Sequence, residues 1–344
     1  LMPMLYPATV QEIIDYGLYG WAMSRFCGAW TGFKLTADSV DTAAPVDADP
    51  HRLQIVLPEF AFPEDGVHIR FGDYWKDQEP RLRNFKLPAA LAFARANNLN
   101  RVVIDSPRPR YGIISSGKAS VDVHQSLAEM GIDDAQASDL GIRFLKIAMP
   151  HPFDDQAVRD FAMGLEEILV VEEKRRVIET RVRDALYDLP DGQRPRVVGR
   201  RDPDGTMLLP ECGEFGAEEI GRALAGRIAH FHTSDRIKSR LAFLDAKAGR
   251  AAQRNEMQVA RIPYFCSGCP HNTSTRVPEG SRGQSGVGCH FMASYMNRNT
   301  GAHTHMGGEG ANWIGHAPFT DAKHVFQNIG DGTYFHSGLL AIRA

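Results

Sequence analysis

The 344-residue chain lacks any apolar run that approaches the roughly 18 residues needed to cross a membrane. Its opening residues, LMPMLYPATVQE, also lack the basic head and apolar core of a secretory signal. Neither sign of charge dominates, because the net charge is only −3. These absences argue against a membrane protein and against nucleic acid or an anionic membrane as the main partner.

Cysteine is scarce, with five residues in all. An odd number does not resemble the disulfide framework of a secreted protein, so a reducing cytoplasm is expected. Cys27 and Cys212 stand far from the other three and are expected to be ordinary buried thiols. With 43% hydrophobic and 24% charged residues, the composition is typical of a globular protein with two or three domains.

Residues 9–26 predict a helix that begins with a capping signal, Thr9 followed three residues later by Glu12. Its expected apolar face comprises Ile14, Leu18 and Trp21. A strand is expected at 32–40, GFKLTADSV, and a further helix at 87–98. We interpret this region as the tail of one α/β unit followed by a connecting segment.

From residue 110 apolar strands alternate with amphipathic helices, which predicts βαβ units and a parallel sheet covered on both faces. The fold class is therefore α/β. The expected strands are 110–117, 142–150, 167–173 and 194–200, and the expected helices are 120–131, 154–165, 174–189 and much of 216–254.

The last 80 or so residues concentrate glycine, histidine and cysteine. Gly330, Asp331 and Gly332 follow an apolar strand and precede a helix expected from about Tyr334. A carboxylate there is well placed to hold Mg²⁺, and the helix N-terminus to hold a diphosphate. A plain strand-to-helix turn is the alternative, and these three residues alone favour it, because Asp-Gly is a common pair in turns.

Cys266 and Cys269 form a C-x-x-C turn, and Cys289 follows 20 residues after the second. Three thiolates at this spacing suit an iron–sulfur cluster or zinc, each of which usually takes four ligands. Buried cysteines without metal are the alternative. If the three bind one cluster, their sulfur atoms must converge beside the Gly330–Gly332 loop.

Together, FCSGCPHNTST, GVGCHFMA, MGGEGANWIG and HVFQNIGDGTYFHSGLLAIRA resemble indolepyruvate ferredoxin oxidoreductase, in its long single-chain bacterial form. YPATVQEIIDYGLYGWAMSR, near the start, resembles the end of that family's pyrimidine-binding domain. GIISSGKASVDVHQSLAEMGI resembles its transketolase C-terminal-like domain. The resemblance implies parallel-sheet thiamine-diphosphate-binding folds over nearly the whole chain.

The resemblance also implies cofactors and the residues that hold them. Asp331 is the expected Mg²⁺ ligand, at the carboxyl end of a central strand, with Gly307 and Gly308 nearby. Cys266, Cys269 and Cys289 are the expected ligands of a [4Fe–4S] cluster, with the fourth ligand not in view. The expected thiamine diphosphate contacts are His290, Met306, Gly307, Gly308, Gly330, Asp331, Gly332 and Thr333.

The implied activity is oxidative decarboxylation of an aryl 2-oxoacid such as indolepyruvate, with coenzyme A and ferredoxin as partners. A homo-oligomer is expected. The chain is expected to be a segment of a longer polypeptide, because it begins at Leu1 and stops within a predicted helix. By resemblance the activating Glu and the second Mg²⁺ ligand lie outside it, so alone it should be inactive. A non-oxidative thiamine enzyme and a zinc-stabilised structural module are the alternatives.

The predicted division has five segments. They are the end of a pyrimidine-binding domain (1–57), a connecting segment (58–108), a transketolase C-terminal-like domain (109–230), a helical linker (231–260) and the start of a thiamine-diphosphate-binding domain (261–344).

Overall fold

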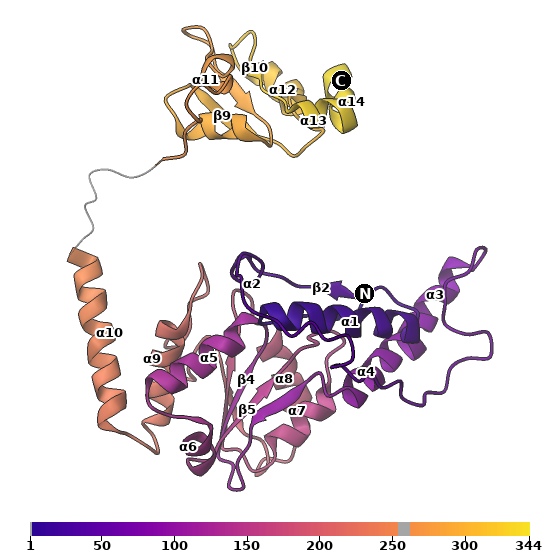
Figure 1. Ribbon diagram of the computed structural model, residues 1–344, viewed down its shortest axis with the longest axis vertical. Helices are drawn as coiled ribbons and strands as arrows, with labels where there is room; N and C mark the ends of the chain where they lie inside the picture. Colours follow the sequence, from indigo (N-terminus) through magenta and orange to yellow (C-terminus); the bar gives the residue numbers. More distant parts are fainter. Residues whose placement is uncertain (1, 254–261) are drawn as a thin grey trace. The chain divides into compact units, whose positions relative to one another are not determined.

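Two compact units make up the chain in the computed structural model, which describes residues 2–253 and 262–344 (Figure 1). The first unit spans Leu1–Arg250 and the second Ala251–Ala344. The five predicted segments stay a prediction, and the predicted boundary after residue 260 lies outside the described residues. No helix within the described residues is long and apolar enough to span a membrane.

A five-stranded sheet with the order β3-β5-β4-β6-β7 forms the centre of the first unit. β4 to β7 run parallel, which confirms the predicted α/β class, whereas β3 pairs antiparallel with β5 at one edge. β3 was not predicted, because it falls in the expected connecting segment. The strands are Arg101–Ile104 (β3), Tyr111–Ser115 (β4), Ile142–Lys146 (β5), Glu167–Val171 (β6) and Arg196–Val198 (β7).

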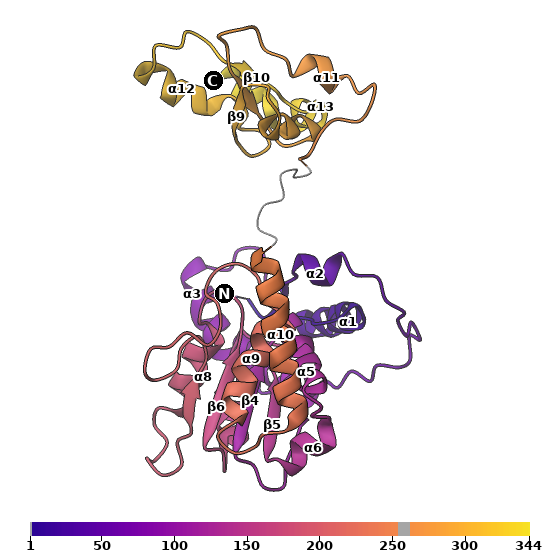
Figure 2. The ribbon, with the colours of Figure 1, turned by 90° about the vertical axis from the view of Figure 1, so that its left-hand side faces the viewer.

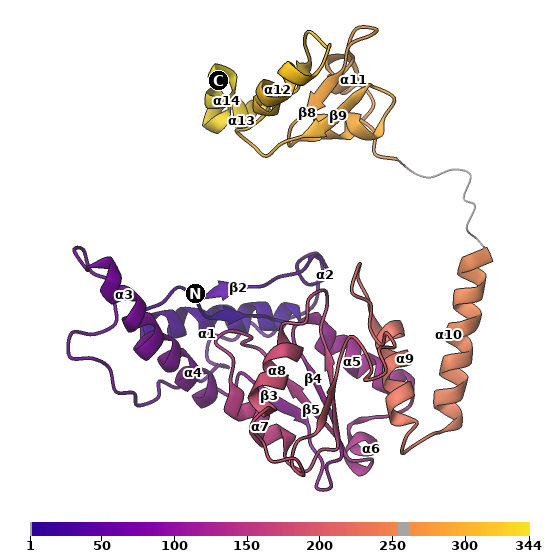
Figure 3. The same ribbon diagram turned by 180° about the vertical axis from the view of Figure 1, so that it is seen from behind.

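Helices cover both faces of this sheet (Figures 2 and 3). Successive strand residues point to opposite faces, so Ile113 and Leu169 enter one core and Ile114 and Val170 the other. The first core is closed by α5 (Lys118–Glu129), α6 (Asp134–Asp139), α9 (Ala217–Ile228) and α10 (Asp235–Gln253), and the second by α7 (Asp155–Ala162) and α8 (Ile178–Leu186). Burial on both faces explains why the strands read as continuous apolar runs.

A third core joins the N-terminal helices to the end of β5. Met23 and Cys27 of α1 pack with Phe93 of α4 and with Met149, which follows β5. The elements of this region are β1 (Met4–Leu5), α1 (Val10–Cys27), β2 (Gly32–Phe33), α2 (Ala37–Val40), α3 (Trp75–Arg81), the π-helix η1 (Leu82–Lys86) and α4 (Leu87–Ala96).

The start of α1 is as predicted, but its buried face is not. Thr9 Oγ1 accepts a hydrogen bond from the Glu12 amide at 3.2 Å. Ile14, Leu18 and Trp21 are 39%, 45% and 70% exposed. The helix instead buries a different face, which carries Glu12, Tyr16, Gly20, Met23 and Cys27.

Glu12 lies on the buried face of α1 with its charge paired. Its carboxylate contacts Lys146 of β5, accepts a hydrogen bond from Ala8 N at 2.8 Å and lies 3.5 Å from Arg101. This buried carboxylate is fully partnered, so it satisfies the condition under which a charge is tolerated in a core. The strand predicted at 32–40 is wrong beyond Phe33, because Ala37–Val40 forms α2 with Thr36 as its cap.

The second unit is built on a small parallel sheet with the order β10-β8-β9. Among its described residues, only Phe265 and Ala293 are fully buried apolar side chains. Its elements are α11 (His271–Ser274), β8 (Gly283–Ser285), η2 (Cys289–Tyr295), β9 (Thr300–His303), α12 (Ala311–His316), η3 (Ala317–Phe319), β10 (Phe326–Gln327), α13 (Asp331–Thr333), the π-helix η4 (Tyr334–Gly338) and α14 (Leu339–Arg343).

Candidate functional site

Asp331 opens the helical stretch α13–η4–α14, directly after the turn that follows β10. The predicted strand, glycine loop and helix are therefore present. The prediction of a central strand is wrong for the described residues, because β10 pairs there with β8 alone and forms an edge. Short-range pattern sets the strand-to-helix turn, whereas the place of a strand in a sheet depends on partners distant in sequence.

Three glycine-containing segments, 286–290, 305–310 and 330–338, contact one another in the second unit. An atom added as a side chain at Gly330 would stand 3.9 Å from the His290 ring and 3.7 Å from Val287 O. The same atom at Gly307 would stand 2.9 Å from Ser337 Oγ. The Gly307 loop therefore packs against Ser337, in the helical stretch that Asp331 begins.

Gly286 lies where two of these segments approach each other closely. A side chain there would begin 2.6 Å from Glu309 Cγ, 3.0 Å from Glu309 Oε1 and 3.1 Å from His290 Nε2. Atoms cannot approach so closely, so any other residue would displace both side chains. Glycine allows the close approach of a backbone to its surroundings that this arrangement needs.

Buried polar atoms without a hydrogen-bond partner gather in these segments. His290 Nε2, Glu309 Oε1, Thr333 Oγ1 and Ser337 Oγ all lack one among the described residues. Nearby in sequence, Gln284 Oε1, Thr304 Oγ1 and Arg282 Nε also lack one. Leaving such a group unpaired costs about 1–3 kcal/mol, and native proteins usually pair it with protein, water or ligand. The set indicates a polar binding site.

The other predicted contact residues fall around this site with different exposure. Thr333 is buried, and Gly308 lies against the His305 ring. Met306 is 48% exposed, Asp331 and Gly332 are exposed, and the space beside Gly332 is open. The structure thus brings Thr333, Gly330, Gly307 and His290 together, and leaves Asp331 at the solvent edge.

The three clustered cysteines are not assembled into a ligand set. Cys269 N donates to Cys266 O at 3.0 Å, which forms the C-x-x-C turn, and Cys269 Sγ lies 3.2 Å from His271 Nδ1. Cys266 and Cys289 are exposed. Within residues 2–253 and 262–344, no group of three His, Cys, Asp or Glu side chains is arranged to hold a metal ion.

Of the two remaining cysteines, Cys27 is buried as predicted, but Cys212 is exposed. The prediction for Cys212 is wrong because it lies in the irregular segment between β7 and α9, outside the packed elements.

A line of aromatic contacts connects the C-x-x-C turn to the glycine segments. Phe265 stacks on His271 with ring centroids 5.3 Å apart, and His271 stacks on His290 at 6.3 Å. Burial lowers the pKa of His290, the neighbouring His271 lowers it further, and Glu309 opposes both. The imidazole of His290 is therefore held toward its neutral form.

These residues fit a bound diphosphate better than they fit an iron–sulfur cluster. The unpaired hydroxyls of Thr333 and Ser337 supply hydrogen-bond donors beside the Gly307 and Gly330 backbone, the surroundings that phosphate oxygens take. Asp331 offers a carboxylate at the rim, and Mg²⁺ needs only one or two carboxylates when phosphates and water complete its shell. The described cysteines alone do not fit a cluster.

Sequence reasoning missed Glu309, Ser337 and Gln284. Glu309 is 2% exposed, and its second oxygen accepts a hydrogen bond from Gly307 N at 2.7 Å. The available signal for Glu309 was its position within the glycine-rich stretch MGGEG, because an ordinary surface loop does not require a charged residue between glycines. Ser337 and Gln284 gave no comparable signal.

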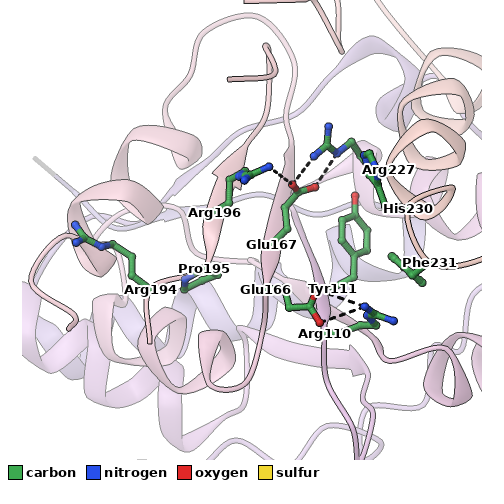
Figure 4. Close-up of a pocket in the computed structure, with 10 residues that line it drawn as sticks. All are labelled: Arg110, Tyr111, Glu166, Glu167, Arg194, Pro195, Arg196, Arg227, His230 and Phe231. Carbon is green, nitrogen blue, oxygen red and sulfur yellow. Dashed lines mark hydrogen bonds and ion pairs between the residues drawn. The ribbon is translucent and has the colours of Figure 1, made fainter. Parts of the chain in front are cut away.

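The first unit holds a separate cavity of about 620 Å³ at the amino ends of β4, β6 and β7 (Figure 4). Its charged groups are engaged with one another: Arg227 with Glu167, and Arg110 with Glu166 at 3.2 Å. Open parallel sheets bind ligands at the carboxyl ends of their strands instead. We therefore place the candidate site in the second unit.

Fold and site together define an α/β protein with a glycine-lined polar site fit for a phosphate-bearing ligand. Residues 101–252 match the family model described as "Indolepyruvate oxidoreductase domain". The match confirms the resemblance inferred from the sequence motifs, although the particular single-chain form remains a prediction.

Two relatives are each named "Indolepyruvate oxidoreductase subunit IorA". The protein of Methanothermobacter marburgensis is 27% identical over 98% of this chain and 51% of its own length. The protein of Pyrococcus horikoshii is 24% identical over 99% of this chain and 52% of its own length. The chain thus spans about half the length of the curated relatives it matches.

Two solved structures share part of the architecture. A 2-oxoglutarate:ferredoxin oxidoreductase from Magnetococcus marinus has a TM-score of 0.40 and 12% identity over 66% of this chain and 42% of its own. A split-gene transketolase has a TM-score of 0.35 and 15% identity over 67% of this chain and 58% of its own. Neither score is high enough to carry an argument about function.

Proposed function

We propose that the chain is part of a thiamine-diphosphate-dependent enzyme that oxidatively decarboxylates aryl 2-oxoacids, indolepyruvate among them. The match of residues 101–252 to the indolepyruvate oxidoreductase domain supports this assignment. The observation that carries the cofactor site is the convergence of unpaired buried hydroxyls with glycine backbone in the second unit. Coenzyme A and ferredoxin are the proposed acyl and electron acceptors.

Each residue of the site has a role that follows from its position. Thr333 and Ser337 donate hydrogen bonds to phosphate oxygens, and Gly307 and Gly330 let the backbone approach them. Asp331 would supply a carboxylate ligand to Mg²⁺. When bound, thiamine diphosphate supplies the electron sink that decarboxylation of a 2-oxoacid requires, and the protein binds and orients it.

We also propose that Cys266, Cys269 and Cys289 bind a [4Fe–4S] cluster, which takes no part in binding the diphosphate. Cys269 contacts His271, which stacks on His290 beside the Gly330 loop. That contact line would put a cluster near the cofactor. Iron and sulfide analysis of the complete protein, purified without oxygen, tests it. Stoichiometric zinc would favour a structural module, and absence of metal a non-oxidative thiamine enzyme.

Replacement of Asp331 tests the cofactor site. In the complete polypeptide, Asp331→Ala should lower the Mg²⁺-dependent affinity for thiamine diphosphate at least about 100-fold, or about 2.7 kcal/mol, because it removes the carboxylate proposed to bind the metal. Isothermal calorimetry with and without Mg²⁺ measures this, and circular dichroism should show an intact fold.

The matched control is Asp321→Ala, an exposed carboxylate in the same unit. It should leave the affinity unchanged. Equal losses in the two variants, or wild-type affinity in Asp331→Ala, would remove the metal assignment. Residues 1–344 alone should bind the cofactor weakly and show no activity.

A further inference from the structure

A row of aligned side chains lines the cavity at the amino ends of β4, β6 and β7 in the first unit. Tyr111 of β4 pairs in register with Glu167 of β6, and Glu167 pairs with Arg196 of β7. Paired residues on neighbouring parallel strands point to the same face of a sheet, so these three side chains stand side by side. Figure 4 shows the Tyr111 hydroxyl pointing toward Glu167 and Arg227.

Tyr111 brings an unsatisfied hydroxyl to this cavity. The residue is 2% exposed, and its hydroxyl has no hydrogen-bond partner among the described residues. Burial raises the pKa of Tyr111 well above its ordinary value, the charge of Glu167 raises it further, and Arg227 opposes both. The hydroxyl therefore keeps its proton and is able to donate it. Since buried hydroxyls are usually paired with protein, water or ligand, this one indicates a partner that enters the cavity.

Arginines outnumber the acidic residues that line the cavity. Two carboxylates and four guanidinium groups belong to the lining: Glu166, Glu167, Arg110, Arg194, Arg196 and Arg227. Arg227 is held firmly, because it contacts Glu167 and also Asp202, which lies outside the lining. Arg194 contacts Asp191, whose side chain is 97% exposed. The lining therefore carries an excess of positive charge, and Arg227 is the cation with the firmest partners.

Two of the arginines are free to bind an anion because their present contacts are weak. Arg196 lies 4.0 Å from Glu167, and its side chain is 63% exposed. Arg110 lies 3.2 Å from Glu166, and both of these side chains are exposed. Exposed ion pairs contribute little to stability. A guanidinium group gains more from a phosphate, which accepts two parallel hydrogen bonds from it.

We propose that this cavity is a second ligand site, where Arg110, Arg196 and the Tyr111 hydroxyl bind the phosphate group of a small phosphate ester. A phosphate group has three terminal oxygens, and three donor groups from two strands meet it here. The cavity of about 620 Å³ has the size of a small-molecule pocket, so it also accommodates the organic part of the ester. This site goes beyond the proposed activity and does not depend on it.

Calorimetry with inorganic phosphate tests the site. The complete polypeptide is first saturated with thiamine diphosphate and Mg²⁺, so that added phosphate does not report on the proposed cofactor site. Wild-type protein should then bind phosphate with a Kd of about 1 mM or lower. Arg196→Gln should weaken this binding about 10-fold or more, because it removes a charge-assisted contact. If thiamine diphosphate does not bind, the proposed function fails, yet the same comparison of phosphate affinities still tests the cavity.

Tyr111→Phe separates a ligand site from a structural one. The lost hydroxyl has no partner in the ligand-free protein, so thermal stability without phosphate should not fall. Phosphate affinity should fall about 5-fold. A drop in stability with unchanged phosphate affinity would show that the hydroxyl is structural. Should this variant fail to fold, Arg196→Lys replaces it, with an expected affinity between those of wild type and Arg196→Gln, because lysine keeps the charge but not the planar fork.

Arg176→Gln is the matched control. The Arg176 side chain is 58% exposed and lies 4.0 Å from Glu179, away from the cavity lining. This variant should bind phosphate as wild type does. Absence of phosphate binding in wild type, an equal loss in Arg176→Gln, or tighter binding of succinate than of phosphate would overturn the proposed site.

Discussion

In the first unit, side chains such as Leu127 and Phe144 fill two cores on either side of the sheet, whereas the described interior of the second unit holds mainly Thr, Ser, Gln, His and Glu. Among the described residues, seven in the second unit carry buried polar atoms without partners, against four in the first, although the first is more than twice as long. In a core that stabilises a fold, polar groups are paired with other protein groups, whereas in a ligand-free binding site some of them stay unpaired.

The largest expected effect comes from the apolar core of the first unit. Phe144 is fully buried in β5 between α5 and the neighbouring strands. Phe144→Ala should lower the free energy of unfolding by about 4 kcal/mol, through lost burial and the cavity left behind. Urea denaturation followed by circular dichroism measures it.

Phe335→Ala in the second unit is the control for that comparison, since Phe335 is 86% exposed. It should change stability by less than about 0.5 kcal/mol. Similar costs for the two substitutions would show that the contrast between the units is wrong.

The next largest effect on stability is expected from the buried ion pair between Glu12 and Lys146. Glu12→Gln leaves the ammonium of Lys146, which is 6% exposed, without a charged partner in the core. We expect a loss of about 3 kcal/mol in unfolding free energy. Glu79→Gln, which breaks the exposed pair with Arg83, should cost well under about 1 kcal/mol.

The loss in Glu12→Gln should depend on pH. Burial lowers the pKa of Lys146 below its ordinary value, although Glu12 opposes that shift. The folded state therefore disfavours the protonated ammonium, so above neutral pH the penalty declines as the pH rises through the lowered pKa. A penalty that grows with pH would contradict this account.

The smallest effect has the opposite sign. Ser337→Ala removes an unpaired buried hydroxyl from the second unit, so the unliganded protein should gain about 1 kcal/mol of stability while losing affinity for thiamine diphosphate. Ser294→Ala is the comparison, because the Ser294 hydroxyl donates to Phe291 O at 2.7 Å and its loss should destabilise. Thermal unfolding with and without ligand distinguishes the two.

Sequence alone was sufficient for the middle of the chain. Continuous apolar runs located β4 to β7, and period-3.6 patterns located the helices between them, because both patterns depend only on residues that are close in sequence. The motifs likewise located the glycine segments of the second unit and four residues that converge there. These strands, helices and glycine segments could be predicted because each depends on residues that are close together in sequence.

Tertiary structure decided what depends on partners distant in sequence. Ile14, Leu18 and Trp21 have correct helical spacing, yet α1 turns its other face inward, where Glu12 meets Lys146, which lies 134 residues away. The edge position of β10 and the meeting of Glu309 with Gly286 and His290 are of the same kind. A linear pattern records which face of an element is apolar, but only the assembled chain determines which groups find partners and which are left to bind a ligand.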